Sequence, residues 1–85
     1  MKYEVKWTET ALKQLKKLEK CISKKIVEKV EGISENPFKF VKKLKGINLY
    51  TLRVGDYRAI LAIEGKSLIV FVLEVGHRKK LYQKF

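Results

Sequence analysis

The stretch that decides the fold runs Tyr50-Thr-Leu-Arg-Val-Gly-Asp-Tyr-Arg-Ala-Ile-Leu-Ala-Ile63. β-Branched, aromatic and aliphatic residues flank Gly55-Asp56, a pair that accepts the positive φ angles of a two-residue turn. The pattern predicts a β-hairpin in which Arg53 faces Arg58. Two arginines that face each other on one side of a sheet repel, so the pair makes sense if an anion lies between them. The alternative is two solvated surface arginines, and this pair alone does not decide between the two.

Arginine is confined to the C-terminal part of a chain that otherwise uses lysine. The three arginines among the 20 Lys and Arg residues are Arg53, Arg58 and Arg78. Lysine supplies general positive charge, whereas the planar fork of arginine suits two-point contact with phosphate oxygens. The placement suggests a phosphate-recognising cluster; the alternative is that three arginines fall in this region by chance.

The charge balance limits the class of partner. The formal net charge of +11, from 20 basic and 9 acidic side chains, indicates nucleic acid, an acidic protein or a membrane surface. No apolar run is long enough to span a bilayer, no signal-peptide pattern opens the chain, and one cysteine cannot form an internal disulfide. We therefore expect a cytoplasmic protein without a membrane segment. With one His and one Cys we expect no metal site, and Cys21 fits a small core residue better than a nucleophile.

Hydrophobic periodicity in the first half predicts a strand and two helices. Residues 2–7 alternate as in a strand. Apolar residues at three- and four-residue steps then predict an amphipathic helix that starts after the N-cap Thr8 and extends to Ile22. Ser23 is the expected cap of a second helix, which ends before Asn36-Pro37.

The second half predicts an exposed, lysine-rich loop over 38–46, followed by strands over 47–54, 57–64 and 68–75. A three-residue turn at 65–67 would place Arg58 opposite Glu74, whereas a two-residue turn would place it opposite Leu73. We expect the three-residue turn because it matches charge with charge. Glu74 and Arg78 would then share the face of the arginine pair.

The order of elements is β-α-α-β-β-β. It predicts a small α+β fold, a single domain over 1–85, with an antiparallel-rich twisted sheet and a helical hairpin packed on one face.

Four stretches in this order resemble the RelE/ParE superfamily of toxin–antitoxin toxins, and the RelE branch more than the ParE branch. They are Ala11–Leu18, Lys43–Gly46, Tyr50–Arg58 and Val75–Tyr82. The resemblance covers essentially the whole chain. It implies a RelE-like fold and a ribosome-dependent, metal-independent endoribonuclease without cofactor. Such a toxin cleaves mRNA in the ribosomal A site through 2′-hydroxyl attack and so inhibits translation. The alternative within the superfamily is a non-enzymatic ParE-like toxin that binds and inhibits DNA gyrase.

The resemblance also implies a partner. It is a small, acidic, RelB-like antitoxin that forms a hetero-oligomer with the toxin and blocks its activity. An acidic partner agrees with the basic charge of the chain.

The resemblance implies catalytic roles for Arg53, Arg58, Arg78 and Tyr82. Arg58 and Arg78 would stabilise the charge of a phosphorane, and Tyr82 would orient or deprotonate the 2′-hydroxyl or stack on a base. The alternative for Tyr82 is an anchor of the C-terminal tail. Thr51 stands where some relatives carry a further lysine, which leaves the identity of the general base open.

Six further residues are candidate contacts to RNA or the ribosome: Lys42, Lys43, Lys45, His77, Lys79 and Lys80. His77 is expected at a strand end, in contact with backbone or RNA, rather than as an acid or base. The sequence has no histidine pair and no carboxylate cluster of the kind used by self-sufficient ribonucleases. We therefore expect the ribosome to supply the alignment of the RNA.

Overall fold

The computed structural model of the protein describes residues 2–84, and the side chains of residues 2–81. In chain order the elements are β1 (Glu4–Trp7), α1 (Glu9–Lys16), α2 (Lys20–Gly32), the 3-10 turn η1 (Pro37–Lys39), β2 (Lys42–Lys43), β3 (Tyr50–Val54), β4 (Tyr57–Glu64), β5 (Ile69–His77) and α3 (Arg78–Lys84). The sheet order is β1-β5-β4-β3-β2, and only β1 and β5 pair in parallel. The predicted α+β architecture is confirmed.

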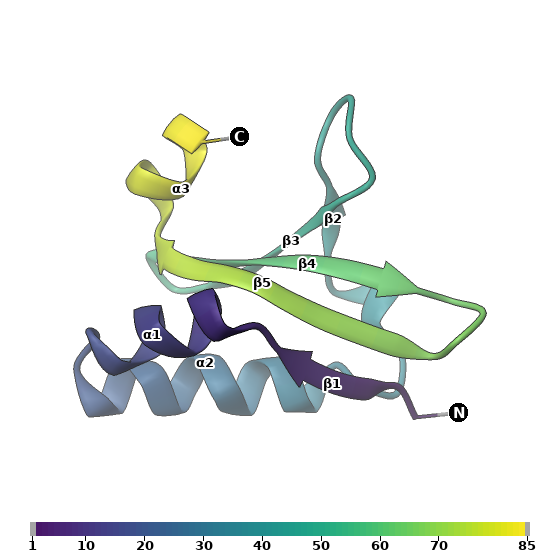
Figure 1. The fold of residues 1–85 in the computed structure, drawn as a ribbon, viewed down its shortest axis with the longest axis horizontal. Helices are drawn as coiled ribbons and strands as arrows, with labels where there is room; N and C mark the ends of the chain where they lie inside the picture. The colour runs from purple at the N-terminus through teal and green to yellow at the C-terminus, as the bar shows by residue number, and fades with distance from the viewer. Residues whose placement is uncertain (1, 85) are drawn as a thin grey trace.

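The helices cover one face of this sheet. Figure 1 shows α1 and α2 below the strands, whereas α3 and the β2–β3 connection extend from the other side. The core lies between the sheet and the two long helices, and its buried residues include Ala11, Leu15, Ile26, Val30, Leu52, Ala59, Leu61, Val70 and Val72. Each buried Val, Leu or Ile side chain of this core stabilises the fold by about 1.5–3 kcal/mol. No helix in the described part of the chain is long and apolar enough to cross a membrane.

The helical hairpin forms as expected, but its break lies elsewhere. Thr8 caps α1 as predicted, because its Oγ1 accepts a hydrogen bond from Ala11 N–H at 3.1 Å. The prediction that the first helix extends to Ile22 is wrong: α1 ends at Lys16 and α2 begins at Lys20. Ser23 does not cap α2. Ser23 lies inside that helix, and its hydroxyl donates to the Leu15 carbonyl at 2.7 Å, which gives a further partner to an acceptor at the end of α1.

Cys21 is exposed, so the expectation of a core position is also wrong. Ile22, the next residue of α2, packs against the core, and Ile26 lies within it. The helix break changes which side of α2 faces inward, and the apolar spacing alone did not reveal it.

The lysine-rich stretch is not a simple loop. Lys42 and Lys43 form the edge strand β2, with Lys42 opposite Thr51 and Lys43 opposite Tyr50. Charged residues commonly occupy such edges, because they discourage pairing with another chain. The following strand begins at Tyr50 rather than at residue 47.

The register of the β4–β5 hairpin differs from the prediction. Glu64 pairs with Ile69, so the turn contains four residues, with Leu68 at a φ of 55°. A bulge then shifts the register between Ile60 and Leu61, and Arg58 faces Gly76 instead of Glu74. Charge matching along the sequence misses a bulge, because the extra residue is set by neighbouring structure.

Contacts from Thr8 and from α1 lie beside this bulge. The Thr8 hydroxyl lies 3.0 Å from the carbonyl oxygens of both Val72 and Leu73, at the point where β1 stops covering the edge of β5. Beyond that point the Gln14 side chain replaces a neighbouring strand: its Oε1 accepts from Val75 N–H at 2.8 Å. The two polar side chains therefore hold the end of β5 that leads into α3.

Candidate functional site

The β3–β4 hairpin places the arginine pair as predicted. Arg53 faces Arg58 across the strands, and Gly55 in the turn has a φ of +60°, which favours glycine. The neighbouring residues Leu52 and Ala59 point into the core. Since successive residues of a strand point to opposite faces, both arginines lie on the face that α1 and α2 leave uncovered.

A hollow of about 270 Å³ opens on this face. It is lined by Phe40, Lys42, Thr51, Arg53 and Arg58. These residues come from the end of η1, from β2, and from the two strands of the central hairpin. We call it the arginine hollow. Its lining combines two guanidinium groups and an ammonium group with a hydroxyl and an aromatic ring.

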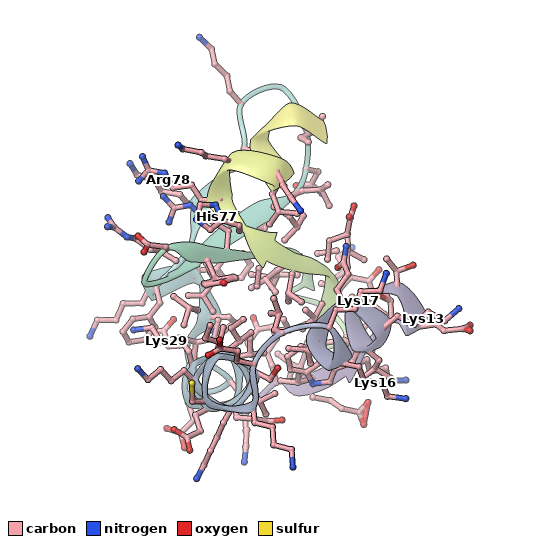
Figure 2. The ribbon with its side chains drawn as sticks, turned by 90° about the vertical axis from the view of Figure 1, so that its left-hand side faces the viewer. Lys13, Lys16, Lys17, Lys29, His77 and Arg78 are labelled. Atoms are coloured by element: carbon pink, nitrogen blue, oxygen red, sulfur yellow. The ribbon has the colours of Figure 1, made fainter. Side chains whose placement is uncertain are left out.

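Arg78 joins the same end of the sheet through its backbone. Its N–H donates to the carbonyl of Asp56 at 3.1 Å, which ties the start of α3 to the turn of the β3–β4 hairpin. Arg58 lies opposite Gly76, two residues before Arg78. Arg53 and Arg58, which are close in sequence, are thus joined by Arg78 where the central hairpin meets α3. Figure 2 shows Arg78 and His77 at this end, away from Lys13 and Lys16 on α1 and from Lys17 just after it.

His77 belongs to a different surface. It faces Tyr57, whose ring it meets edge-on with centroids 5.5 Å apart. Tyr57 packs against the core, so His77 points to the helix-covered side, away from the arginine hollow. The His77 Nδ1 also accepts from Lys79 N–H at 3.3 Å. The expected backbone contact is confirmed, and contact with RNA stays a prediction.

The candidate lysines divide between surfaces. Lys42 lines the arginine hollow, and Lys43, opposite Tyr50, points to the other face. Lys45 is exposed in the β2–β3 connection, and Lys79 is exposed on α3. Lys80 instead lines a second cleft, described next.

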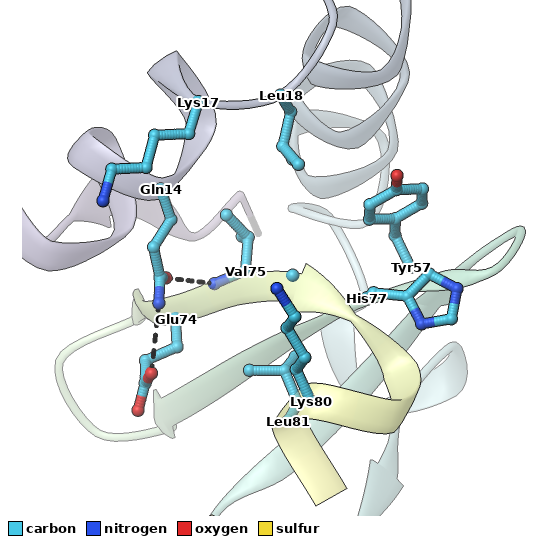
Figure 3. Close-up of a pocket in the computed structure, with 10 residues that line it drawn as sticks. Gln14, Lys17, Leu18, Tyr57, Glu74, Val75, His77, Lys80 and Leu81 are labelled. Atoms are coloured by element: carbon cyan, nitrogen blue, oxygen red, sulfur yellow. Dashed lines mark hydrogen bonds between the residues drawn. The ribbon is translucent and has the colours of Figure 1, made fainter.

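This second cleft, of about 630 Å³, lies between α1, the end of β5 and α3, and Figure 3 shows its lining. Gln14 bridges its wall, because its Nε2 donates to Glu74 Oε1 at 3.2 Å while its Oε1 accepts from Val75 N–H. Glu74, expected opposite Arg58, lies opposite Ile60 instead. Gln14 was not singled out from the sequence, since an isolated glutamine on a helix carries no local signal of such a bridge.

Tyr82 belongs to α3, and its side chain lies outside the described residues. Two other residues of the site were not identified from the sequence as site residues: Phe40, whose side chain is 49% exposed, and Thr51. An aromatic residue among lysines was the available signal for Phe40. Within the described residues, no group of three His, Cys, Asp or Glu side chains could hold a metal ion.

The fold and the family match identify a small toxin of the toxin–antitoxin class. Residues 5–82 match the family described as ParE toxin of type II toxin-antitoxin system, parDE, so the chain belongs to the RelE/ParE toxin superfamily. It is 34% identical over 83 residues to a RelE-like toxin protein of Escherichia coli, covering 94% of this chain and 87% of that one. It is 30% identical over 83 residues to the mRNA interferase toxin RelE of E. coli K12, with the same coverage.

A solved structure agrees with this assignment. A chain of the toxin–antitoxin complex RelBE2 from Mycobacterium tuberculosis has a TM-score of 0.85 and 31% identity, covering 92% of this chain and 100% of that chain. The resemblance inferred from the sequence is therefore confirmed. The protein is a toxin of a toxin–antitoxin system, of the RelE type.

Proposed function

We propose that this toxin is a ribosome-dependent endoribonuclease that cleaves mRNA in the ribosomal A site. The observation that carries the proposal is the pairing of Arg53 with Arg58 on the uncovered sheet face, with Arg78 tied by its backbone to the turn of the same hairpin. The similarity to a protein named mRNA interferase toxin RelE supports it. The proposed setting is the cytoplasm, where the ribosomes are.

The chemistry suits these groups. The RNA's own 2′-oxygen attacks the adjacent phosphorus, the bond from phosphorus to the 5′-oxygen breaks, and a 2′,3′-cyclic phosphate and a 5′-hydroxyl form. The 2′-hydroxyl loses a proton, and the leaving oxygen gains one. Arg58 and Arg78 stabilise the negative charge that develops on the phosphorane oxygens. Tyr82 is the proposed group that orients or deprotonates the 2′-hydroxyl.

The ribosome supplies alignment in this mechanism. Holding the 2′-oxygen in line with the leaving oxygen is worth roughly 7–11 kcal/mol of the barrier. The proposed contacts to RNA phosphates are Lys42, Lys43, Lys45, His77, Lys79 and Lys80. Of these, Lys42 lies beside the arginines and contacts the mRNA, while the others lie on other surfaces and serve docking on ribosomal RNA.

The proposed regulator is a small acidic antitoxin that forms a hetero-oligomer with this domain. The similar structure from M. tuberculosis is that of a toxin–antitoxin complex. The net charge of +11 favours an acidic partner. We expect the two chains to co-purify and to resist dissociation by high salt alone, because such a partner also covers apolar surface. Complete separation in moderate salt would contradict a wrapped interface.

The test compares purified toxin on naked mRNA and on programmed ribosomes at matched salt, with cuts mapped by primer extension. We expect cuts within the A-site codon on ribosomes and slow or no cutting of naked RNA. Comparable rates on both substrates would contradict the role given to the ribosome.

The second candidate is a ParE-like toxin that inhibits DNA gyrase without cleaving RNA. The match to a family named after ParE favours it, and a shared fold does not decide between the two. Inhibition of DNA supercoiling with intact mRNA would support this candidate and exclude the first.

A further inference from the structure

Two residues that line the arginine hollow have no role in stabilising the charge of the transition state. The first is Phe40. It is 49% exposed, and its only ring contact within the described residues is with Lys39, whose Nζ lies 5.8 Å from the ring centroid. Phe38, two residues earlier, packs edge-on against Tyr3 and Tyr50 with centroids 6.4 and 5.5 Å apart. Phe38 thus has a structural role, whereas Phe40 presents a ring at the rim of the hollow.

The second feature is the Thr51 hydroxyl. Its Oγ1 is the one buried side-chain polar atom in the described part of the chain that has no hydrogen-bond partner. A buried hydroxyl without a partner destabilises a fold. Thr51 lies opposite both Lys42 and Ile60 and lines the hollow together with the arginine pair. A ligand in the hollow would supply the missing partner once the neighbouring atoms that cover this oxygen move aside.

We propose that the arginine hollow is a subsite for one RNA nucleotide next to the scissile phosphate. Its base stacks on Phe40, its sugar or phosphate oxygen pairs with Thr51 Oγ1, and its phosphate lies against Arg53 and Arg58. This inference rests on the proposed function and deepens it, because it assigns two residues to substrate positioning. Both are positioning residues that bind the nucleotide beside the reacting bond.

The chemistry of the lining favours a nucleotide over an acidic peptide. A carboxylate would be recognised by the cations alone and would leave Phe40 without a role. A nucleotide carries a flat ring, hydroxyl and ester oxygens, and a charged phosphate, which match the aromatic, hydroxyl and guanidinium groups. The Lys39 contact does not block the ring, because an exposed cation–π contact is weaker than base stacking.

Stacking also predicts the kind of specificity. Every base has a stacking face, so Phe40 tightens binding with little preference among bases. The contribution of Phe40 should therefore appear in the KM for ribosomes carrying different A-site codons, by a similar factor for each.

The experiment measures two properties of Phe40→Ala, Phe40→Trp and Thr51→Val. One is kcat and KM for cleavage on programmed ribosomes. The other is binding of an RNA trinucleotide whose central 2′-oxygen is methylated and which cannot be cleaved, followed by backbone amide shifts in NMR. Ile47→Ala is the matched control, since Ile47 is 41% exposed in the β2–β3 connection and is not among the residues that line the hollow.

We expect Phe40→Ala to weaken trinucleotide binding and raise KM by about five- to a hundredfold, with kcat little changed, and Phe40→Trp to restore both. Thr51→Val should weaken binding by about two- to tenfold and, because it removes a buried unpaired hydroxyl, raise the melting temperature of the free toxin. Opposite changes in binding and stability separate ligand contact from a structural role.

Unchanged binding and KM in Phe40→Ala, with cleavage by the wild type intact, would overturn the subsite and leave the proposed function standing. Trinucleotide binding that depends on Phe40, in a toxin that leaves ribosomal mRNA intact, would support the subsite and overturn the proposed function. Weakened antitoxin binding by Phe40→Ala with normal RNA binding would assign the hollow to the antitoxin and overturn the proposal.

Discussion

The two faces of the sheet have different roles although they are built from the same strands. On the covered face Leu52, Ala59 and Leu61 are at most 1% exposed and pack under the helices. On the uncovered face the neighbouring residues Arg53, Arg58 and Thr51 line a hollow instead of a core. Strand alternation thus lets one short hairpin hold the fold together with one set of residues and present cations with the next. The two sets should respond differently to mutation.

The largest expected effect on stability lies on the covered face. Leu61→Ala removes a side chain that is 0% exposed and leaves a cavity, which should lower the free energy of unfolding by about 2–5 kcal/mol. Urea denaturation followed by circular dichroism measures this loss. A loss below about 1 kcal/mol would mean that the covered face is not the core described here.

The largest expected effect on activity lies on the uncovered face. Arg58→Ala or Arg78→Ala should each lower cleavage on ribosomes by about a hundredfold or more, since each removes a donor to the transition state. Their melting temperatures should stay close to that of the wild type, because neither side chain fills the core. Near-normal cleavage by a folded Arg58→Ala/Arg78→Ala double variant would eliminate the site.

An intermediate effect on stability should appear at the end of β5, where the Gln14 side chain accepts a hydrogen bond from the strand. Gln14→Leu removes the acceptor of Val75 N–H and should cost about 1–3 kcal/mol of stability. Hydrogen exchange of the Val75 amide should accelerate in this variant more than that of Val70, which is fully buried deeper in the same strand. Equal acceleration at both amides would indicate global destabilisation rather than release of the strand end.

The smallest expected effect concerns long-range charge. Lys42→Ala should lower the steepness of the plot of log affinity for RNA against log salt concentration by about one, the change expected for one phosphate contact. Lys16→Ala, on α1 and away from the arginines (Figure 2), is the matched control with the same charge change. Equal changes in both variants would show that net charge, rather than position, governs binding.

Several features followed from local sequence. The turn at Gly55-Asp56 and the alternation around it are short-range properties, so the pairing of Arg53 with Arg58 was predicted correctly. The N-cap at Thr8 is equally local, because its hydroxyl bonds three residues ahead. The family resemblance added the overall architecture.

Tertiary structure alone decided the rest, because the responsible contacts join residues distant in the chain. The register of β5 depends on Thr8 and Gln14, which lie 60 or more positions away from the strand residues that they bond. The predicted facing of Arg58 and Glu74 failed for two reasons: the turn contains four residues rather than three, and no turn pattern encodes the bulge. Likewise, the position of Phe40 beside Thr51 arises only when β2 pairs with β3. Local physics built the hairpin, and packing of α1 and β2 around it made the site.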